Sequence, residues 1–343
     1  MTDQQAAELG PPGTPLVLGF APGAMPVALV ILIGSALGPY GLGLLSAGVL
    51  ASLDPAMPVA LAALGVFVGI GINLRTKRDR GALAATSIRA IVAMGIVAAG
   101  AAVVLPVWSA ALEPSDWFNA AFLAIAAADD PLAVVAGGIA LAFVREASPA
   151  AAGMLLLHAS GIALVIAAAG WLLLSRSGPD TEQRIFVIAL LLLLGGASEY
   201  LSMSALATGL VAGFFWEAMG GSTRKGIRRD VLYVQRPLVL LILVVSGAML
   251  VLTPVVLAVG LPYLILRLVG TIVGSAAAQR LVPTWSATDG SVTVLSPGVV
   301  GLAFALNAVR ATGYEATIIS IVVVGAVGSE LLALLLRARD VVE

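Results

Sequence analysis

The feature that most constrains this chain is a succession of apolar segments, each about as long as a membrane is thick. A helix of about 20 apolar residues crosses the hydrocarbon core of a bilayer with its backbone hydrogen bonds made internally. Eleven candidate segments lie near residues 16–37, 57–74, 82–107, 117–142, 149–174, 183–197, 200–218, 231–252, 255–282, 296–309 and 314–336. The sequence therefore predicts an all-α polytopic membrane protein with about 10–12 transmembrane helices.

Composition narrows the function classes. Of the 343 residues, 60% are hydrophobic and 11% are charged, so no soluble domain fits between the segments. The net charge of −1 and the lack of a basic tract with interleaved aromatics argue against a nucleic-acid partner. The absence of cysteine excludes disulfides and thiolate metal sites. The sequence shows neither a nucleophile with its base nor a phosphate loop, so nothing in it indicates an enzyme. We also predict no cofactor.

The charges of the connections predict an orientation, because Lys and Arg collect on the cytoplasmic side. The polar tail 1–15 lacks the basic region of a secretory signal, so we expect no processing. Basic clusters occur at 75–80, 224–229 and 337–339, whereas the connection 108–116 carries two acids and no base. We place the clusters and both termini in the cytoplasm, with the protein in the cell (inner) membrane. The number of crossings is then even, and the stretch 183–218 crosses an odd number of times.

Two adjacent carboxylates and a proline, Asp129-Asp130-Pro131, lie inside an apolar stretch from about Phe118 to Val144. An ionisable pair at bilayer depth costs several kcal/mol, so it is a candidate functional site. Proline removes a backbone donor and favours an interruption of the helix there. An ordinary proline kink is the alternative, but a kink needs no carboxylates.

A second break, Ser296-Pro297-Gly298, begins another apolar segment. Each break lies in the second-to-last segment of its half of the chain. We therefore expect an inverted-repeat transporter fold with repeats 16–174 and 200–343, joined by a linker region 175–199. In such folds two discontinuous helices cross at the midplane, where their ends bind ions. At Pro297 an ordinary kink is an equal alternative.

Several glycine-rich motifs occur along the chain: Gly38-Pro-Tyr-Gly-Leu-Gly-Leu44, residues 64–71, residues 197–213, Leu266-Arg267-Leu-Val-Gly270 and Ser296-Pro-Gly-Val-Val-Gly301. In this order they resemble the monovalent cation:proton antiporter superfamily over most of the chain. The resemblance implies a secondary transporter that exchanges Na⁺, K⁺ or Li⁺ for protons. Glycine spacings such as Gly65-xxx-Gly69 are interpreted as helix packing.

The acidic motif admits two registers within that family. In the first, Asp130 lies on the unwound fourth helix, and the family's essential carboxylate would fall near Ser160, where this chain has no acid. In the second, Asp129 and Asp130 are themselves the ion-binding pair, which leaves too few helices upstream. In both registers these two carboxylates are the only midmembrane acids of the first half.

The chemistry of such a site is competition. Two carboxylates side by side in a low-dielectric cavity cannot both ionise cheaply, so a proton and a hard cation compete for the same oxygens. The hydroxyls of Ser160 or Ser296 could complete the shell. Adjacent side chains diverge by about 100° on a regular helix, so Asp129 and Asp130 share one site only if the backbone is unwound.

Two other polar residues are candidates. Arg267 is interpreted as a counter-ion to the acids, with snorkelling to an interface as the alternative. If Arg267 takes the place of a membrane-embedded Lys of that family, a second proton-carrying group is missing, because Arg keeps its proton, and electroneutral exchange is then favoured. His158, the only histidine, is a candidate pH sensor, with a hydrogen-bonded buried residue as the alternative.

Three functions remain open at this point: cation:proton antiport, sodium-coupled transport of an organic anion that Arg267 would bind, and a transport-inactive relic. A homodimer is also left open.

Overall fold

The computed structural model describes residues 27–72, 77–108, 116–146, 148–175, 180–282, 298–312 and 316–342. Within these ranges the regular secondary structure is helical. The elements are α2 (Val27–Leu37), α3 (Ala47–Leu53), the 3₁₀ helix η1 (Asp54–Ala56), α4 (Met57–Gly71), α5 (Lys77–Trp108), α6 (Asp116–Ala127), α7 (Pro131–Arg145), α8 (Pro149–Leu174), α9 (Asp180–Tyr200), α10 (Ala205–Met219), α11 (Gly221–Ala248), α12 (Pro254–Leu281), α14 (Val299–Thr312) and α15 (Ala316–Val342).

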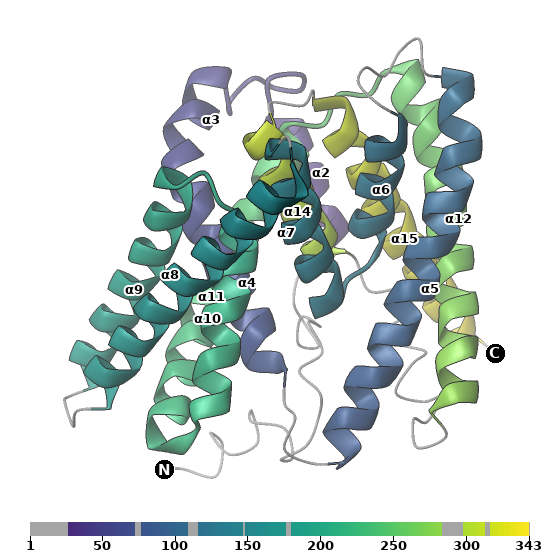
Figure 1. Cartoon of the computed structure of the whole chain (residues 1–343). Coiled ribbons are helices and arrows are strands. Elements are labelled where there is room, and N and C mark those ends of the chain that lie inside the picture. The colour runs from purple at the N-terminus through teal and green to yellow at the C-terminus, as the bar shows by residue number, and fades with distance from the viewer. Residues whose placement is uncertain are drawn as a thin grey trace.

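Among the described residues, six helices are long and apolar enough to cross a membrane, judged by length and composition. They are Ala47–Gly71, Asp79–Val104, Pro149–Leu174, Thr181–Tyr200, Arg229–Ala248 and Pro254–Leu281. Shorter apolar helices accompany them, α7, α10 and α14 among them. Most of the long helices run between the upper and lower ends of the bundle in Figure 1. The predicted class, an all-helical polytopic membrane protein, is consistent with this architecture.

Small residues bring the helices into close contact. Gly65 and Gly69 of α4 face the backbone of α10, and Gly209 and Gly213 of α10 face the backbone of α4. A Cβ at any of these four positions would collide with a main-chain carbonyl of the other helix. Interfaces of this kind let helices associate in lipid, where apolar burial gives no driving force. The packing interpretation of Gly65-xxx-Gly69 is confirmed.

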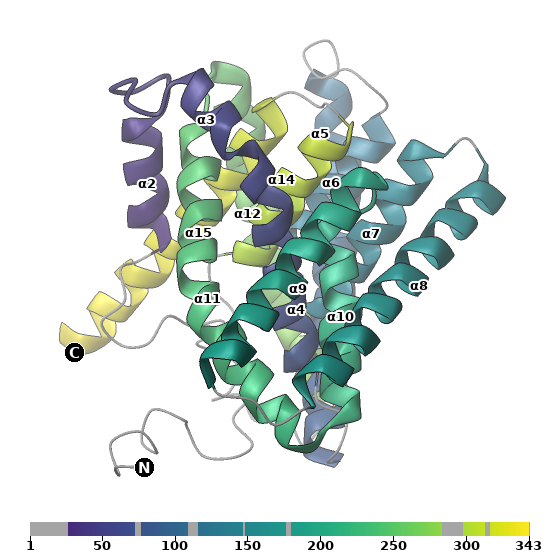
Figure 2. The ribbon, with the colours of Figure 1, turned by 90° about the vertical axis from the view of Figure 1, so that its left-hand side faces the viewer.

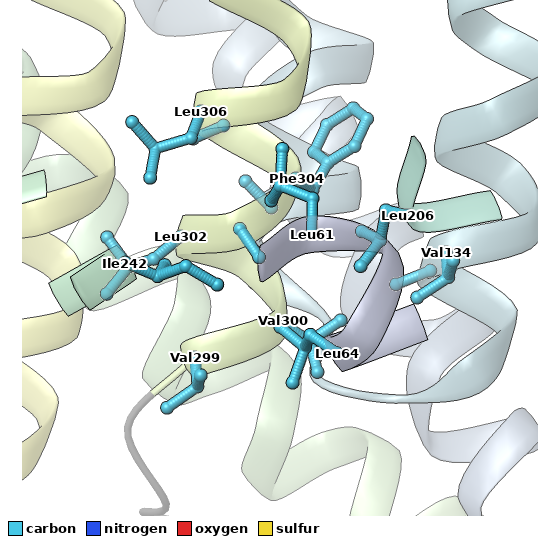
Figure 3. Packing of buried hydrophobic residues seen from close by; sticks show 14 of the residues in the cluster. Leu61, Leu64, Val134, Leu206, Ile242, Val299, Val300, Leu302, Phe304 and Leu306 are labelled. Carbon is cyan, nitrogen blue, oxygen red and sulfur yellow. The ribbon is translucent and has the colours of Figure 1, made fainter. Parts of the chain in front are cut away.

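Helix α14 lies at the centre of the bundle. Its residues from 299 to 308 are buried. Figure 3 shows Phe304 among side chains of other helices, including Leu61 of α4, Val134 of α7 and Leu206 of α10. A helix that is apolar on all sides is stable when it is enclosed by other helices. The start of α14 is therefore fixed deep inside the protein.

Helices α6 and α7 form a hairpin. The Phe304 ring lies 5.0 Å from the Phe122 ring of α6, and it also approaches Gly137 of α7. Residues 122 and 137 lie on opposite sides of the break at 128–130, so α7 runs back alongside α6. Figure 1 shows both helices in the upper half of the bundle. We expected a discontinuous helix that crosses the membrane, but in the structure the chain returns toward the end from which it entered.

The hairpin changes the path of the chain. Helix α9 runs upward and α10 runs downward, so residues 183–218 pass through the bundle twice (Figure 2). The expected odd number of passages is therefore wrong. The beginnings of α5 and α11 nevertheless lie at the same, lower end (Figures 1 and 2), because the hairpin makes no net passage. Most of the predicted linker 175–199 is occupied by the membrane-length helix α9.

Inversion relates one pair of helices and not another. Gly270 and Gly274 of α12 lie against Ala93 and Arg89 of α5, a reversed order that makes the two helices antiparallel. Inverted repeats require this relation. In two inverted repeats, α8 and α15 would also run in opposite directions. Both run from the upper to the lower end in Figures 1 and 2. The described helices thus do not confirm the two expected inverted repeats.

Candidate functional site

The two adjacent acids lie where the chain leaves α6 and enters α7. Ala128, Asp129 and Asp130 are outside both helices, and Pro131 is the first residue of α7. Proline suits this position, because its missing N–H would have no helical partner in the first turn. Asp130 is the N-cap residue and has an extended backbone, but its side chain makes no capping hydrogen bond to the first turn of α7. The helix is interrupted at the predicted place.

Asp129 is paired with Arg267 of α12. The distance from Arg267 Nη2 to Asp129 Oδ2 is 2.7 Å. The Arg267 side chain is 4% exposed and lies halfway along α12, so it does not reach a membrane surface. A charge-assisted hydrogen bond of this length is among the stronger contacts that a buried carboxylate can make. Arg267 thus lies beside an acid of the break, and the snorkelling alternative does not describe it.

Asp130 is paired with Arg89, which we did not single out from the sequence. Arg89 Nη2 of α5 lies 3.2 Å from Oδ1 and 3.4 Å from Oδ2 of Asp130. Both residues are buried. A signal was present, because Arg89 is the only charged residue in the apolar segment 82–107. It is the same kind of signal that drew attention to Arg267.

The beginning of α14 completes the site. The Gly301 N–H donates to Asp129 Oδ1 over 3.5 Å. A Cβ at Gly298 would lie 2.7 Å from that same oxygen and 2.5 Å from Arg267 Nη2. The N-terminal end of a helix carries a partial positive charge, which favours a carboxylate nearby. Ser296 and Pro297, the other two residues of the predicted second break, lie outside the described residues.

The acids and arginines share one small pocket. Its lining consists of Arg89, Ala90, Ala93, Ala127, Ala128, Asp129, Asp130, Arg267, Leu268, Thr271 and Ser329. The charged side chains balance in number, with two carboxylates facing two guanidinium groups. The pocket can therefore hold an ion only if that ion replaces one of the charged partners or joins a pair. Four separate parts of the chain line the pocket: α5, the end of α6 with the break, α12 and α15.

Two other candidates lie elsewhere. Ser160 of α8 lines a second pocket, together with Arg145, Ser204 and Thr208, and is absent from the lining of the first. The structure thus does not bring Ser160 together with Asp129 and Asp130 in one pocket. His158 is exposed on the outer side of α8.

The ligands available for a metal ion are few. Among the described residues, no group of three or more His, Asp or Glu side chains is placed to hold one. Asp129 and Asp130 are thus the acidic oxygens that a monovalent cation would find in the pocket. No family model matches the chain, and no curated protein matches it. The resemblance carried by the motif order stays a prediction.

Proposed function

We propose that this chain is a secondary active transporter that exchanges a monovalent cation, Na⁺, K⁺ or Li⁺, for protons. The observation that carries the proposal is the pocket at the helix break, where one buried and one half-buried carboxylate face two buried arginines. Carboxylates at membrane depth are rare and usually mark an ion pathway or a proton relay. Discontinuous helices at such sites are a recurrent feature of transporters.

The proposed exchange takes place at Asp129. In the ion-free state Arg267 neutralises this carboxylate, because an uncompensated buried charge is costly. A cation that enters the pocket replaces the guanidinium at the carboxylate oxygens. A proton that binds Asp129 neutralises the carboxylate, so the ion pair with Arg267 is also lost. Cation and proton thus exclude each other, and alternate opening of the site to the two sides couples their movements.

We further propose that the lower end of the bundle faces the cytoplasm. The basic residues at the start of α5, at the start of α11 and at the end of α15 support this orientation. The loop between α9 and α10 would then be on the opposite side. The membrane would be the cell (inner) membrane.

The test is exchange by the purified protein in liposomes that carry a pH gradient and a pH-sensitive dye. Addition of NaCl, KCl or LiCl should collapse the gradient in liposomes with the unmodified protein. Asp129→Asn should remove this response. Glu182→Gln, which changes an exposed acid in the first turn of α9, is the matched control and should respond normally. Responses of equal size from both variants would reject the proposal.

A second candidate function, sodium-coupled transport of an organic anion, is favoured by one observation. The pocket holds two guanidinium groups, and the N-terminal ends of α7 and α14 lie beside it. These groups would receive a carboxylate or another small anion. The discriminating measurement is the dependence on organic substrate: an antiporter works in inorganic salts alone, whereas the anion transporter needs an organic anion.

A further inference from the structure

A second ion pair lies beside the pair that holds Asp129. One guanidinium nitrogen of Arg89 faces both carboxylate oxygens of Asp130, and the two side chains are only 11% and 10% exposed. The Asp129 side chain is 23% exposed. We propose that Arg89 is a positioning residue that holds Asp130 in a closed ion pair and leaves Asp129 as the carboxylate that binds the transported cation.

The backbone at the break separates the two acids. Asp130 has φ −117° and ψ 161°, which is an extended conformation. Successive side chains along an extended chain point to opposite sides. Asp129 accordingly reaches α12 and α14, whereas Asp130 reaches α5. Unwinding brings both acids to one pocket, but it gives them different partners.

The position of Arg89 is fixed by the contact of α5 with α12. A Cβ at Gly274 of α12 would lie 2.6 Å from the carbonyl oxygen of Arg89 and 3.2 Å from its Cα. One turn away, a Cβ at Gly270 would lie 3.1 Å from the Cα of Ala93. Two glycines on one face of α12 thus allow α5 to pack closely against that face. The guanidinium of Arg89 extends from a stretch of backbone that has little room to move.

The cost of breaking a buried pair distinguishes a positioning role from ion binding. Removal of one partner leaves an uncompensated buried charge and is strongly destabilising, whereas removal of both is close to neutral. If Asp130 only balances Arg89, the neutral double variant keeps the ion site. If Asp130 binds the cation, the double variant loses a ligand and does not transport.

The experiment is a double-mutant cycle with Arg89→Gln, Asp130→Asn and the double variant. Thermal unfolding in detergent and Na⁺/H⁺ exchange in liposomes are both measured. We expect each single change to lower the midpoint of unfolding and the exchange rate. The double variant should recover the midpoint and exchange within about threefold of the unmodified rate, with an unchanged KM for Na⁺. Arg89→Lys, which keeps the charge, should retain exchange.

Two results would overturn the inference. Additive effects of the single changes on the unfolding midpoint would show that Arg89 and Asp130 are not coupled. A double variant that is folded, monodisperse and inactive would make Asp130 itself an ion ligand. The ion-binding half of the inference rests on the proposed function, whereas the thermal cycle needs no transport. Absence of exchange by the unmodified protein would therefore reject the proposed function, and with it that half.

Discussion

Arg267 and Asp129, 138 residues apart in the sequence, form a partly buried ion pair with Nη2 and Oδ2 2.7 Å apart. The pair joins the middle of α12 to the break between α6 and α7. Gly298, which directly precedes α14, and Gly301 in its first turn lie against the same carboxylate. Three distant parts of the chain therefore meet at Asp129. A change in any of them should alter the ion binding that we propose for this carboxylate.

Removal of the Arg267 charge is the first prediction. Arg267→Gln leaves Asp129 without its counter-ion, so stability should fall by roughly 3 kcal/mol, measured as a lower unfolding midpoint in detergent. The KM for Na⁺ should fall as well, because the cation no longer competes with the guanidinium. The maximal rate should fall with it. An unchanged KM would mean that Arg267 does not compete for the ion site.

The second prediction concerns the contact made by Gly298. In Gly298→Ala the new methyl group would stand 2.5 Å from Arg267 Nη2, so the ion pair would have to shift. We expect exchange to fall by roughly tenfold or more, because small displacements at a site have large effects on rate. Gly153→Ala on α8 is the control, since no atom lies within 4 Å of its added Cβ. Equal exchange rates in the two variants would contradict the predicted contact.

The third prediction concerns orientation. The chain has no native cysteine, so a single introduced cysteine can be labelled without background. Ser202 is exposed in the connection between α9 and α10, and Ser175 is exposed at the end of α8. In intact cells, Ser202→Cys should react with an impermeant maleimide. Ser175→Cys should react only after the membrane is opened. The reverse pattern would invert the proposed topology.

Much of the site could be predicted from the sequence, because charged residues inside apolar segments are conspicuous. Asp129, Asp130 and Arg267 stood out for this reason, and the structure places all three at one pocket. Arg89 carried the same signal and was missed, because no motif drew attention to it. Ser160 was assigned from the register of a motif, which fixes an order along the chain and not a position in space.

The hairpin could not be predicted, for a physical reason. Asp-Asp-Pro interrupts a helix in the same way whether the chain then continues or turns back. The direction is decided by packing at a distance, here by Phe304 of α14 between Phe122 and Gly137. Whether the chain crosses the bundle an odd or an even number of times before α11 depends on the turn between α6 and α7. We predicted that the chain continues across the membrane at residues 128–130. The wrong prediction of an odd number of passages for residues 183–218 followed from this.

The most direct test of the central claim is proton release from the purified protein when a cation binds. In weakly buffered detergent solution, addition of Na⁺ should displace protons from the unmodified protein, detected by a pH dye. Osmotically matched choline chloride should release none. Asp129→Asn should release no protons upon addition of Na⁺, because the group shared by cation and proton is gone. If folded Asp129→Asn released as many protons as the unmodified protein, the ion site would lie elsewhere and the account would be wrong.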